Sequence, residues 1–354
     1  MKRPRLNRRR VGLVSIALSL APGACSGSGD EGEAPPGPPV VQVVARGLLN
    51  PVGLAAHPDG GILIAEEGTG DDDLSAGVSM LTTDGRLGRI VSGLPSGRDA
   101  GDLSGAPLVG ISPDGSLGYV GHFGAGSLLT FPTDGLEPET EANPALTPEG
   151  LGAAMVPLNE VRVVNPFDIA FDTDAVPVVA DASQNGVATE NPDGTTRFFH
   201  RFGELEDPQA DFRKIDAVPT GIARVGTEFY VTLTGGCPYP RGSGRLVAID
   251  QERNERVVAA GLNMPIDVAE GPDGVIWLLE FAVFEQGASC FTGEGYRPGT
   301  GRLSRIGSQG DVQEVLDGLD FPGAVLPIPD GSLYVSEIFS GRILHLSWPE
   351  EPGR

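Results

Sequence analysis

The sequence predicts an all-β protein, a six-bladed β-propeller with four-stranded blades that is closed by its own N-terminal strand. Three features support this fold class: a repeated proline motif, tight Pro-Asp-Gly turns that follow it, and incomplete strand sets at the two ends of the repeat. The roughly 315 residues that follow the N-terminal segments are rich in Gly and Pro and contain no convincing amphipathic helix.

The repeat is a proline followed by two residues, an aliphatic residue and alanine. Four copies match this pattern fully, and the copies at residues 107 and 322 are weaker. In chain order the repeat prolines are Pro51, Pro107, Pro166, Pro219, Pro265 and Pro322. Neighbouring prolines lie 46 to 59 positions apart, slightly above the period typical of a four-stranded propeller blade. Six copies therefore predict six blades.

Turns divide each copy into strands. A Pro-Asp-Gly turn such as Pro58-Asp59-Gly60 separates the first strand from the second, because proline presets φ, Asp bonds its own backbone and Gly accepts a positive φ. A Gly-Arg pair opens the third strand in residues 244–249, 301–306 and 341–346. The fourth strand ends in Gly-Leu in residues 89–94, 256–262 and 314–319.

The two ends of the repeat predict how the ring closes. Residues 40–48 form a fourth strand that precedes the first proline copy, whereas the chain ends near Trp348 after only three strands of blade six. We therefore expect the N-terminal strand to complete blade six beside residues 341–346, which removes two exposed sheet edges.

The N-terminus has the pattern of an export signal. A basic stretch, an apolar run over residues 11–20 and the pair Gly23-Ala24 precede Cys25. The run is too short to cross about 30 Å of hydrocarbon as a permanent helix. Small residues before a cysteine are typical of a lipoprotein signal, in which Cys25 is acylated. Pro22 stands where an aliphatic residue is usual, so plain secretion stays open as the alternative.

The chain divides into a signal peptide (1–25), a disordered tether (26–39), the propeller (40–348) and a short tail (349–354). The full chain has a net charge of −23, and without its signal it has 19 Lys and Arg against 48 Asp and Glu. Such a polyanion repels nucleic acid and anionic lipid, so membrane contact is expected only through a lipid anchor. We expect a monomeric periplasmic or cell-surface lipoprotein, or else a secreted protein, whose partner is an unknown small molecule, cation or envelope protein.

Two cysteines remain after removal of the signal, Cys237 and Cys290, an even number in an oxidising compartment. Each follows the second strand of its blade, and the two blades are neighbours. Both cysteines therefore occupy the same type of loop on the same face, and we predict that they form a disulfide.

Candidate functional residues lie where loops meet around the propeller axis. The loops that enter strand one and leave strand two share one face, so we expect two sets of residues at this mouth: those that end strand two and those two positions after each repeat proline. The titratable members of both sets are Glu66, His122, Asp168, Asp181, Asp267, Glu280 and Glu337. An oxygen-rich cluster of this kind suits calcium, and no other cofactor is indicated.

Structural roles compete with ligand binding for these residues. Glu280 and Glu337 precede the Gly-Arg pairs that contain Arg302 and Arg342, with which they could form ion pairs inside a blade. The other four acids have no such obvious cation and are better ligand candidates, although acids at strand ends also cap turns. His122 is either a ligand or base or a pore residue without a chemical role.

Several motifs resemble those of a known propeller family. Leu-x-Asn-Pro-x-Gly-Leu-Ala at 48–55, a following Pro-Asp-Gly turn, and residues 218–223 running into residues 235–242 resemble the ScyD/ScyE proteins. These are NHL-type propellers found beside scytonemin pigment genes. The resemblance covers about residues 40–346 and is best at 264–280. It implies a binding or assembly propeller without assigned catalytic residues; the two cysteines and the insert at 136–158 depart from the family pattern.

A second resemblance leaves an enzymatic alternative open. The number of blades and the acids Asp168 and Asp267 at first-strand starts resemble calcium-dependent lactonases of the gluconolactonase type, although that family's N-terminal Glu-Ala/Gly-Pro-x-Trp motif is missing. The chain after its signal contains no nucleophile elbow, zinc-protease helix or phosphate loop. We therefore expect an exported, non-catalytic ligand- or partner-binding propeller with an acidic mouth that binds a divalent cation. A metal-dependent lactonase is the alternative, and catalytic residues are unknown.

Overall fold

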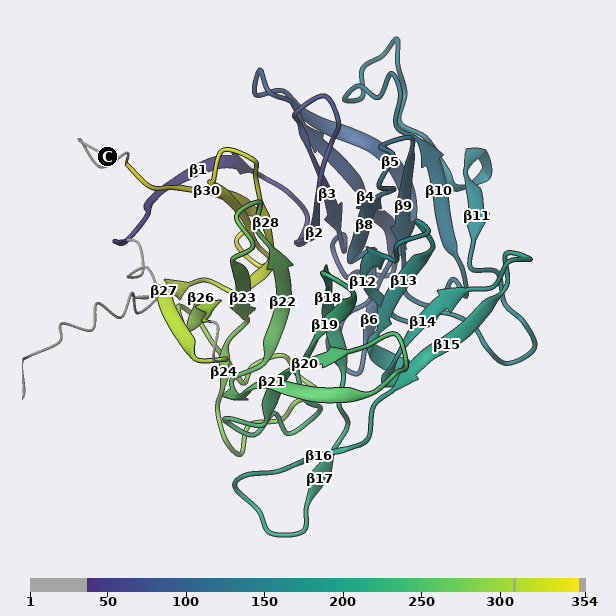
Figure 1. Ribbon diagram of the computed structural model, residues 1–354. Helices are drawn as coiled ribbons and strands as arrows, with labels where there is room; N and C mark the ends of the chain where they lie inside the picture. Colours follow the sequence, from purple (N-terminus) through teal and green to yellow (C-terminus); the bar gives the residue numbers. More distant parts are fainter. Residues whose placement is uncertain (1–36, 308–309, 350–354) are drawn as a thin grey trace, which may run out of the picture. The chain divides into compact units, whose positions relative to one another are not determined.

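A computed structural model describes residues 37–307 and 310–349 (Figure 1). The predicted signal peptide with Cys25, residues 26–36 of the predicted tether, and residues 350–354 of the tail lie outside the described residues. Six antiparallel four-stranded sheets form the blades of a β-propeller, as the sequence predicts. None of the helices among the described residues has the length and apolar character needed to span a membrane.

Each of the first three blades runs outward from its innermost strand in chain order. Blade one consists of β2 (Pro51–Ala56), β3 (Ile62–Glu66), β4 (Asp73–Leu81) and β5 (Leu87–Ser96). Blade two consists of β8 (Leu108–Ile111), β9 (Leu117–Gly121), β10 (Leu128–Pro132) and β11 (Gly152–Ala154). Blade three consists of β12 (Pro166–Phe171), β13 (Pro177–Asp181), β14 (Gly186–Glu190) and β15 (Thr196–Arg201).

The other three blades repeat the arrangement, and the last one takes its outer strand from the N-terminal end of the propeller. Blade four consists of β18 (Pro219–Val225), β19 (Glu228–Leu233), β20 (Gly244–Ile249) and β21 (Glu255–Leu262). Blade five consists of β22 (Pro265–Glu270), β23 (Ile276–Glu280), β26 (Gly301–Ile306) and β27 (Val312–Leu319). Blade six consists of β28 (Pro322–Pro327), β29 (Leu333–Glu337), β30 (Arg342–Ser347) and β1 (Val40–Arg46).

Small elements occur in the connections. Two of them are short 3₁₀ helices, η1 (Pro148–Gly150) and η2 (Ala182–Gln184). Three are two-stranded hairpins: β6 (Arg98–Asp99) with β7 (Asp102–Leu103), β16 (Leu205–Glu206) with β17 (Lys214–Ile215), and β24 (Val283–Phe284) with β25 (Tyr296–Arg297). The first hairpin joins blades one and two, and the third lies inside blade five between β23 and β26.

The six innermost strands contact one another in a closed ring, β2, β8, β12, β18, β22 and β28. Five of the repeat prolines are the first residue of such a strand, a position that needs no ladder N–H, and Pro107 directly precedes β8. Irregular pairing just after the proline lets backbone groups reach the next blade. The Gly53 N–H donates to the Pro107 carbonyl at 2.9 Å. A Cβ on Gly53 would lie 2.5 Å from that oxygen, so the approach requires glycine.

The ends of the propeller close the ring in the predicted way. Strand β1 pairs antiparallel with β30, with Val40 opposite Ser347 (Figure 1). The Trp348 indole donates to the Gly37 carbonyl at 2.8 Å, so residues before β1 also contact the end of the propeller. Between blades six and one, the Ser336 hydroxyl donates to the Val52 carbonyl at 2.6 Å. The sequence-based closure is therefore confirmed.

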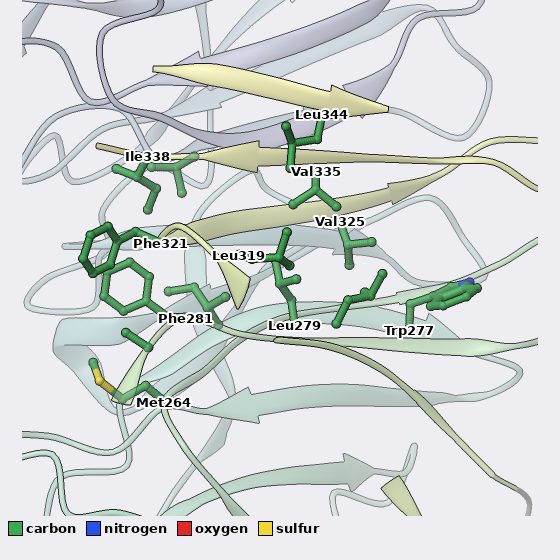
Figure 2. Packing of buried hydrophobic residues seen from close by; sticks show 14 of the residues in the cluster. Met264, Trp277, Leu279, Phe281, Leu319, Phe321, Val325, Val335, Ile338 and Leu344 are labelled. Carbon is green, nitrogen blue, oxygen red and sulfur yellow. The ribbon is translucent and has the colours of Figure 1, made fainter. Parts of the chain in front are cut away.

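The hydrophobic core lies between neighbouring blades. Figure 2 shows the cluster in which Leu279 of blade five faces Val325, Val335 and Leu344 of blade six. Strand β23 is buried along its whole length because both faces of its sheet pack against other side chains. This packing fixes the angular position of each blade and, with it, the position of the loops at the mouth.

Candidate functional site at the propeller mouth

Four of the predicted site acids end the second strand of their blade and share one contact. Each accepts a hydrogen bond from a backbone N–H that lies 17 residues earlier, in the connection that enters strand one. The pairs are Leu49 with Glu66 at 2.5 Å, Val164 with Asp181 at 2.7 Å, Asn263 with Glu280 at 2.6 Å, and Asp320 with Glu337 at 2.7 Å. These carboxylates therefore fix the entry of the innermost strand.

Arginines pair with the three glutamates of this set. Arg302 bonds Glu280 at 2.5 Å, and Arg342 bonds Glu337, which are the pairs that the Gly-Arg motifs suggest. Glu66 pairs with Arg89 of β5 at 3.2 Å, a partner that the sequence did not reveal. Asp181 has no arginine partner among the described residues; it accepts from three backbone N–H groups, and burial raises its pKa.

His122 follows β9 and faces backbone. Its Nδ1 lies 3.2 Å from the Phe123 carbonyl, and burial lowers its pKa, which favours the neutral ring. His122 is not among the described residues that line either of the two cavities discussed below.

Asp168 and Asp267 line a cavity of about 460 Å³ along the innermost strands. Each joins its own blade to the next one: Asp168 accepts the Ile222 N–H at 2.7 Å, and Asp267 accepts the Val325 N–H at 2.7 Å. Burial raises the pKa of both carboxyl groups, and the charge of Asp168 raises that of Asp267 further. Asp168 and Asp267, the two acids predicted two positions after a repeat proline, therefore connect neighbouring blades and also line this cavity.

A separate cavity of about 620 Å³ occupies the mouth. Val52, Phe167 and Ile266, each one residue after a repeat proline, line both cavities and so lie between them. Neither Asp168 nor Asp267 lines the mouth cavity. The two predicted sets of residues therefore do not combine around one opening.

The mouth cavity is lined by the residues that follow the strand-two ends, not by those ends. Successive residues of an extended chain point to opposite sides, so a shift of one position exchanges the side that faces the axis. In five blades the residue that lines this cavity is the one directly after the predicted strand-end position. The lining residues at these places are Glu67, Ala182, Thr234, Phe281 and Ile338.

Two acids, the buried Glu67 and the half-buried Asp102, form the polar part of the mouth cavity. The Glu67 Oε2 accepts the Gly105 N–H, while Oε1 has no hydrogen-bond partner among the described residues. Burial raises the pKa of Glu67 to about 7, against an ordinary 4.5, and the charge of Asp102 contributes to the shift. Asp102 of β7 accepts from the Tyr296 hydroxyl at 2.9 Å and the Tyr239 hydroxyl at 3.3 Å. Burial raises the pKa of Asp102 in spite of these two donors.

Aromatic rings form the wall beside these acids. Tyr296 lies 5.3 Å from Phe281 and 5.9 Å from Tyr239, measured between ring centroids, and Phe281 lies 6.2 Å from Phe339. Phe291 completes the rim and is 66% exposed, whereas Phe281 is buried. The rings contact one another in a continuous series, so the wall is a packed surface rather than a set of separate side chains.

The predicted disulfide between Cys237 and Cys290 is present, with the Cα atoms 6.0 Å apart. It joins the loop that carries Tyr239 to the loop that carries Phe291 and Tyr296. The disulfide thereby joins the parts of the aromatic wall that come from blades four and five, and blade six adds Phe339.

The β6–β7 hairpin reaches this wall from the connection between blades one and two. Gly101 at its turn has φ +97°, and a Cβ there would lie 2.4 Å from the Phe291 carbonyl oxygen. The Tyr239 and Tyr296 hydroxyls also donate to Asp102. These contacts together hold the hairpin against the loops of blades four and five. Sequence analysis missed Asp102 and the tyrosines because they lie in insertions outside the repeat.

The acids that suggested calcium are distributed over separate contacts among the described residues. Within residues 37–307 and 310–349, no group of three or more His, Cys, Asp or Glu side chains is arranged to hold a metal ion. Calcium takes six to eight oxygen ligands, and the strand-end acids already accept backbone hydrogen bonds. Calcium binding therefore stays a prediction, which titration of the protein with calcium tests.

No family model matches the chain, and no curated protein matches it. Solved structures do. A gluconolactonase from Xanthomonas campestris is 12% identical, with a TM-score of 0.58 over 89% of this chain and 91% of its own. A streptogramin B lyase is 12% identical, with a TM-score of 0.51 over 88% of this chain and 98% of its own. The PQQ-bound aldose sugar dehydrogenase of Streptomyces coelicolor is 20% identical, with a TM-score of 0.50 over 89% of this chain and 99% of its own.

The shared property is the propeller fold. At these identities the similarity shows the fold alone, because unrelated chemistries recur on one propeller scaffold. A functional conclusion for this chain therefore has to come from its own cavities.

Proposed function

We propose that this protein is an exported, non-catalytic propeller of the ScyD/ScyE type that binds a small molecule in its mouth cavity. The observation that carries the proposal is the cavity itself. Its volume of about 620 Å³ lies within the range of small-molecule sites, and its aromatic wall with a few convergent polar groups is the usual composition of such sites. A rigid frame of six blades and one disulfide supports it.

A binding role accounts for the chemistry of the lining better than catalysis does. The hydroxyls of Thr220 and Thr234 bond each other and the Pro265 carbonyl. No histidine occurs among the described residues that line the cavity, so none of these hydroxyls has an imidazole base beside it. The carboxyl groups provide recognition, and the aromatic wall provides apolar contact area.

A ligand screen by native mass spectrometry tests this function. A panel of neutral, anionic and cationic amphiphiles is offered to the mature protein, to Phe339→Ala at the rim of the cavity, and to Phe212→Ala. Phe212 is fully exposed and does not line the cavity, so it is a matched control for loss of a phenyl ring. We expect adducts that weaken in Phe339→Ala and persist in Phe212→Ala. Absence of any adduct that depends on the rim contradicts the proposal.

A gluconolactonase-like hydrolase is the second candidate. The observation that favours it is the pair of acids in the second cavity, the half-buried Asp168 and the buried Asp267, together with a fold shared with a gluconolactonase. Hydrolysis of glucono-1,5-lactone with and without added calcium tests it. Turnover that requires calcium and is lost in Asp168→Asn would replace the binding proposal with an enzymatic one.

Export rests on the N-terminal signal pattern, with acylation at Cys25 as the proposed anchor and plain secretion as the alternative. In cells, Cys25→Ser should accumulate unlipidated or unprocessed protein. Normal release of a mature form that starts at another residue would remove the lipoprotein proposal and leave secretion.

A further inference from the structure

We infer that the mouth cavity selects organic cations, molecules that join an ammonium group to an apolar body. The inference rests on the proposed function, because it names the ligand class of that same cavity. Three observations carry it: an incompletely satisfied buried carboxyl group, an excess of acids over bases in the lining, and a continuous wall of aromatic rings.

Glu67 supplies the first observation. The residue is only 6% exposed and lines the cavity, its Oε2 accepts the Gly105 N–H, and its Oε1 accepts no hydrogen bond from the described residues. A buried carboxylate without enough donors is costly, and a cation that donates to it or lies beside it lowers that cost. The cavity thus contains a carboxylate oxygen that has no protein donor among the described residues and is open to a donor from a ligand.

The charges around the cavity favour the same ligand class. Glu67 and Asp102 line it, and near Asp102 the positive charge of Arg98 opposes the negative charge of Asp99. Arg98 is the one cationic residue among the described lining residues; it is exposed, and it donates to the Gly101 carbonyl at 3.1 Å. The chain as a whole has a net charge of −23, which raises the local concentration of cations. An anionic ligand would face the buried Glu67 and the half-buried Asp102.

The wall provides the third observation. Aromatic faces attract cations within about 6 Å of the ring centroid, most strongly where water is excluded. Tyr239, Tyr296, Phe281 and Phe339 stand in one packed series beside the two acids. The Tyr296 and Tyr239 hydroxyls both donate to Asp102, which turns negative charge toward the rings and keeps the rings in place. Rings and carboxylates together form a cage suited to an alkylated ammonium group.

Isothermal titration with two isosteric probes tests the ligand class. Choline carries a trimethylammonium group, and 3,3-dimethylbutan-1-ol carries a neutral tert-butyl group of the same shape. We expect the mature protein to bind choline at least about tenfold more tightly than the alcohol. Glu67→Gln should remove most of this preference and leave the affinity for the alcohol unchanged. Phe339→Ala should weaken choline binding, whereas the control Phe212→Ala should bind like the wild type.

The outcomes separate the ligand class from the function. Equal affinity for both probes, or choline binding that is insensitive to both Glu67→Gln and Phe339→Ala, overturns cation selectivity and leaves the mouth as a site for other ligands. Failure of both probes, joined with a panel screen in which no adduct depends on the rim, overturns the proposed function as well. Circular dichroism melting of each variant confirms that the compared proteins are folded.

Discussion

Replacing Glu67 with Gln should make the protein more stable at neutral and basic pH. Burial raises the pKa of this carboxyl group from 4.5 to about 7. Between these two values the unfolded chain loses a proton that the native chain keeps, so the wild type loses stability as the pH rises through this window. A pKa difference of about 2.5, at about 1.4 kcal/mol per pKa unit, predicts a loss of about 3 kcal/mol that is complete above pH 7.

Urea unfolding of the wild type and Glu67→Gln at about pH 4.5 and about pH 8 measures this loss. Glutamine keeps an oxygen that can accept the Gly105 N–H, so the two proteins should have similar free energies of unfolding at the lower pH. At the higher pH the variant should be more stable by about 3 kcal/mol. Taking the difference between proteins cancels the contributions of Asp168 and Asp267. If the difference in free energy of unfolding between the two proteins does not change with pH, the reasoning is refuted. Glu141→Gln, at an exposed position, is the matched control for the loss of one carboxyl group.

Three further predictions concern the frame. Deleting β1 (Val40–Arg46) should lower the melting temperature far more than deleting residues 26–36, because only the first deletion opens the edge of blade six; similar melting curves would contradict the closure. Serine at both Cys237 and Cys290 should lower the free energy of unfolding by about 4 kcal/mol for a 53-residue separation, and unchanged urea midpoints would argue against a constraining bridge. Gly53→Ala should cost about 1–3 kcal/mol by calorimetry, because its Cβ meets a carbonyl of the next blade; a neutral effect would mean that the blades separate freely.

The fold could be predicted because each repeat contains local sequence signals for its strands and turns. A proline that starts the innermost strand and a Pro-Asp-Gly turn after it are local requirements of backbone conformation, and they recur in the sequence. The turn at Gly60, with φ +92° and an N–H bond to the His57 carbonyl, is one such case. Closure followed from the order of the strands alone.

The site was predicted less well, for two separate physical reasons. The turn predicts where strand two ends but not which side of the strand faces the axis, so it predicts Glu66 at the mouth, whereas the neighbouring Glu67 lines the cavity. Asp102 and Tyr296 lie in insertions whose backbone conformation depends on contacts between distant blades. The repeat pattern does not predict the conformation of these insertions. The adjacent disulfide was predictable because it needed only an even cysteine count and two equivalent loops.

Closure of blade six by strands from the two ends of the propeller also constrains when this protein can fold. The Ser336 hydroxyl bonds a carbonyl 284 positions earlier, and Trp348 bonds one 311 positions earlier. Contacts of such separation cannot form while the C-terminal part of the chain is still being synthesised, and long-range pairing of this kind slows folding. Blades one to five can assemble in order, but the free edge of β30 stays open to other strands until β1 reaches it. The interval before ring closure is therefore the period in which this chain is most exposed to intermolecular strand pairing and most dependent on chaperones.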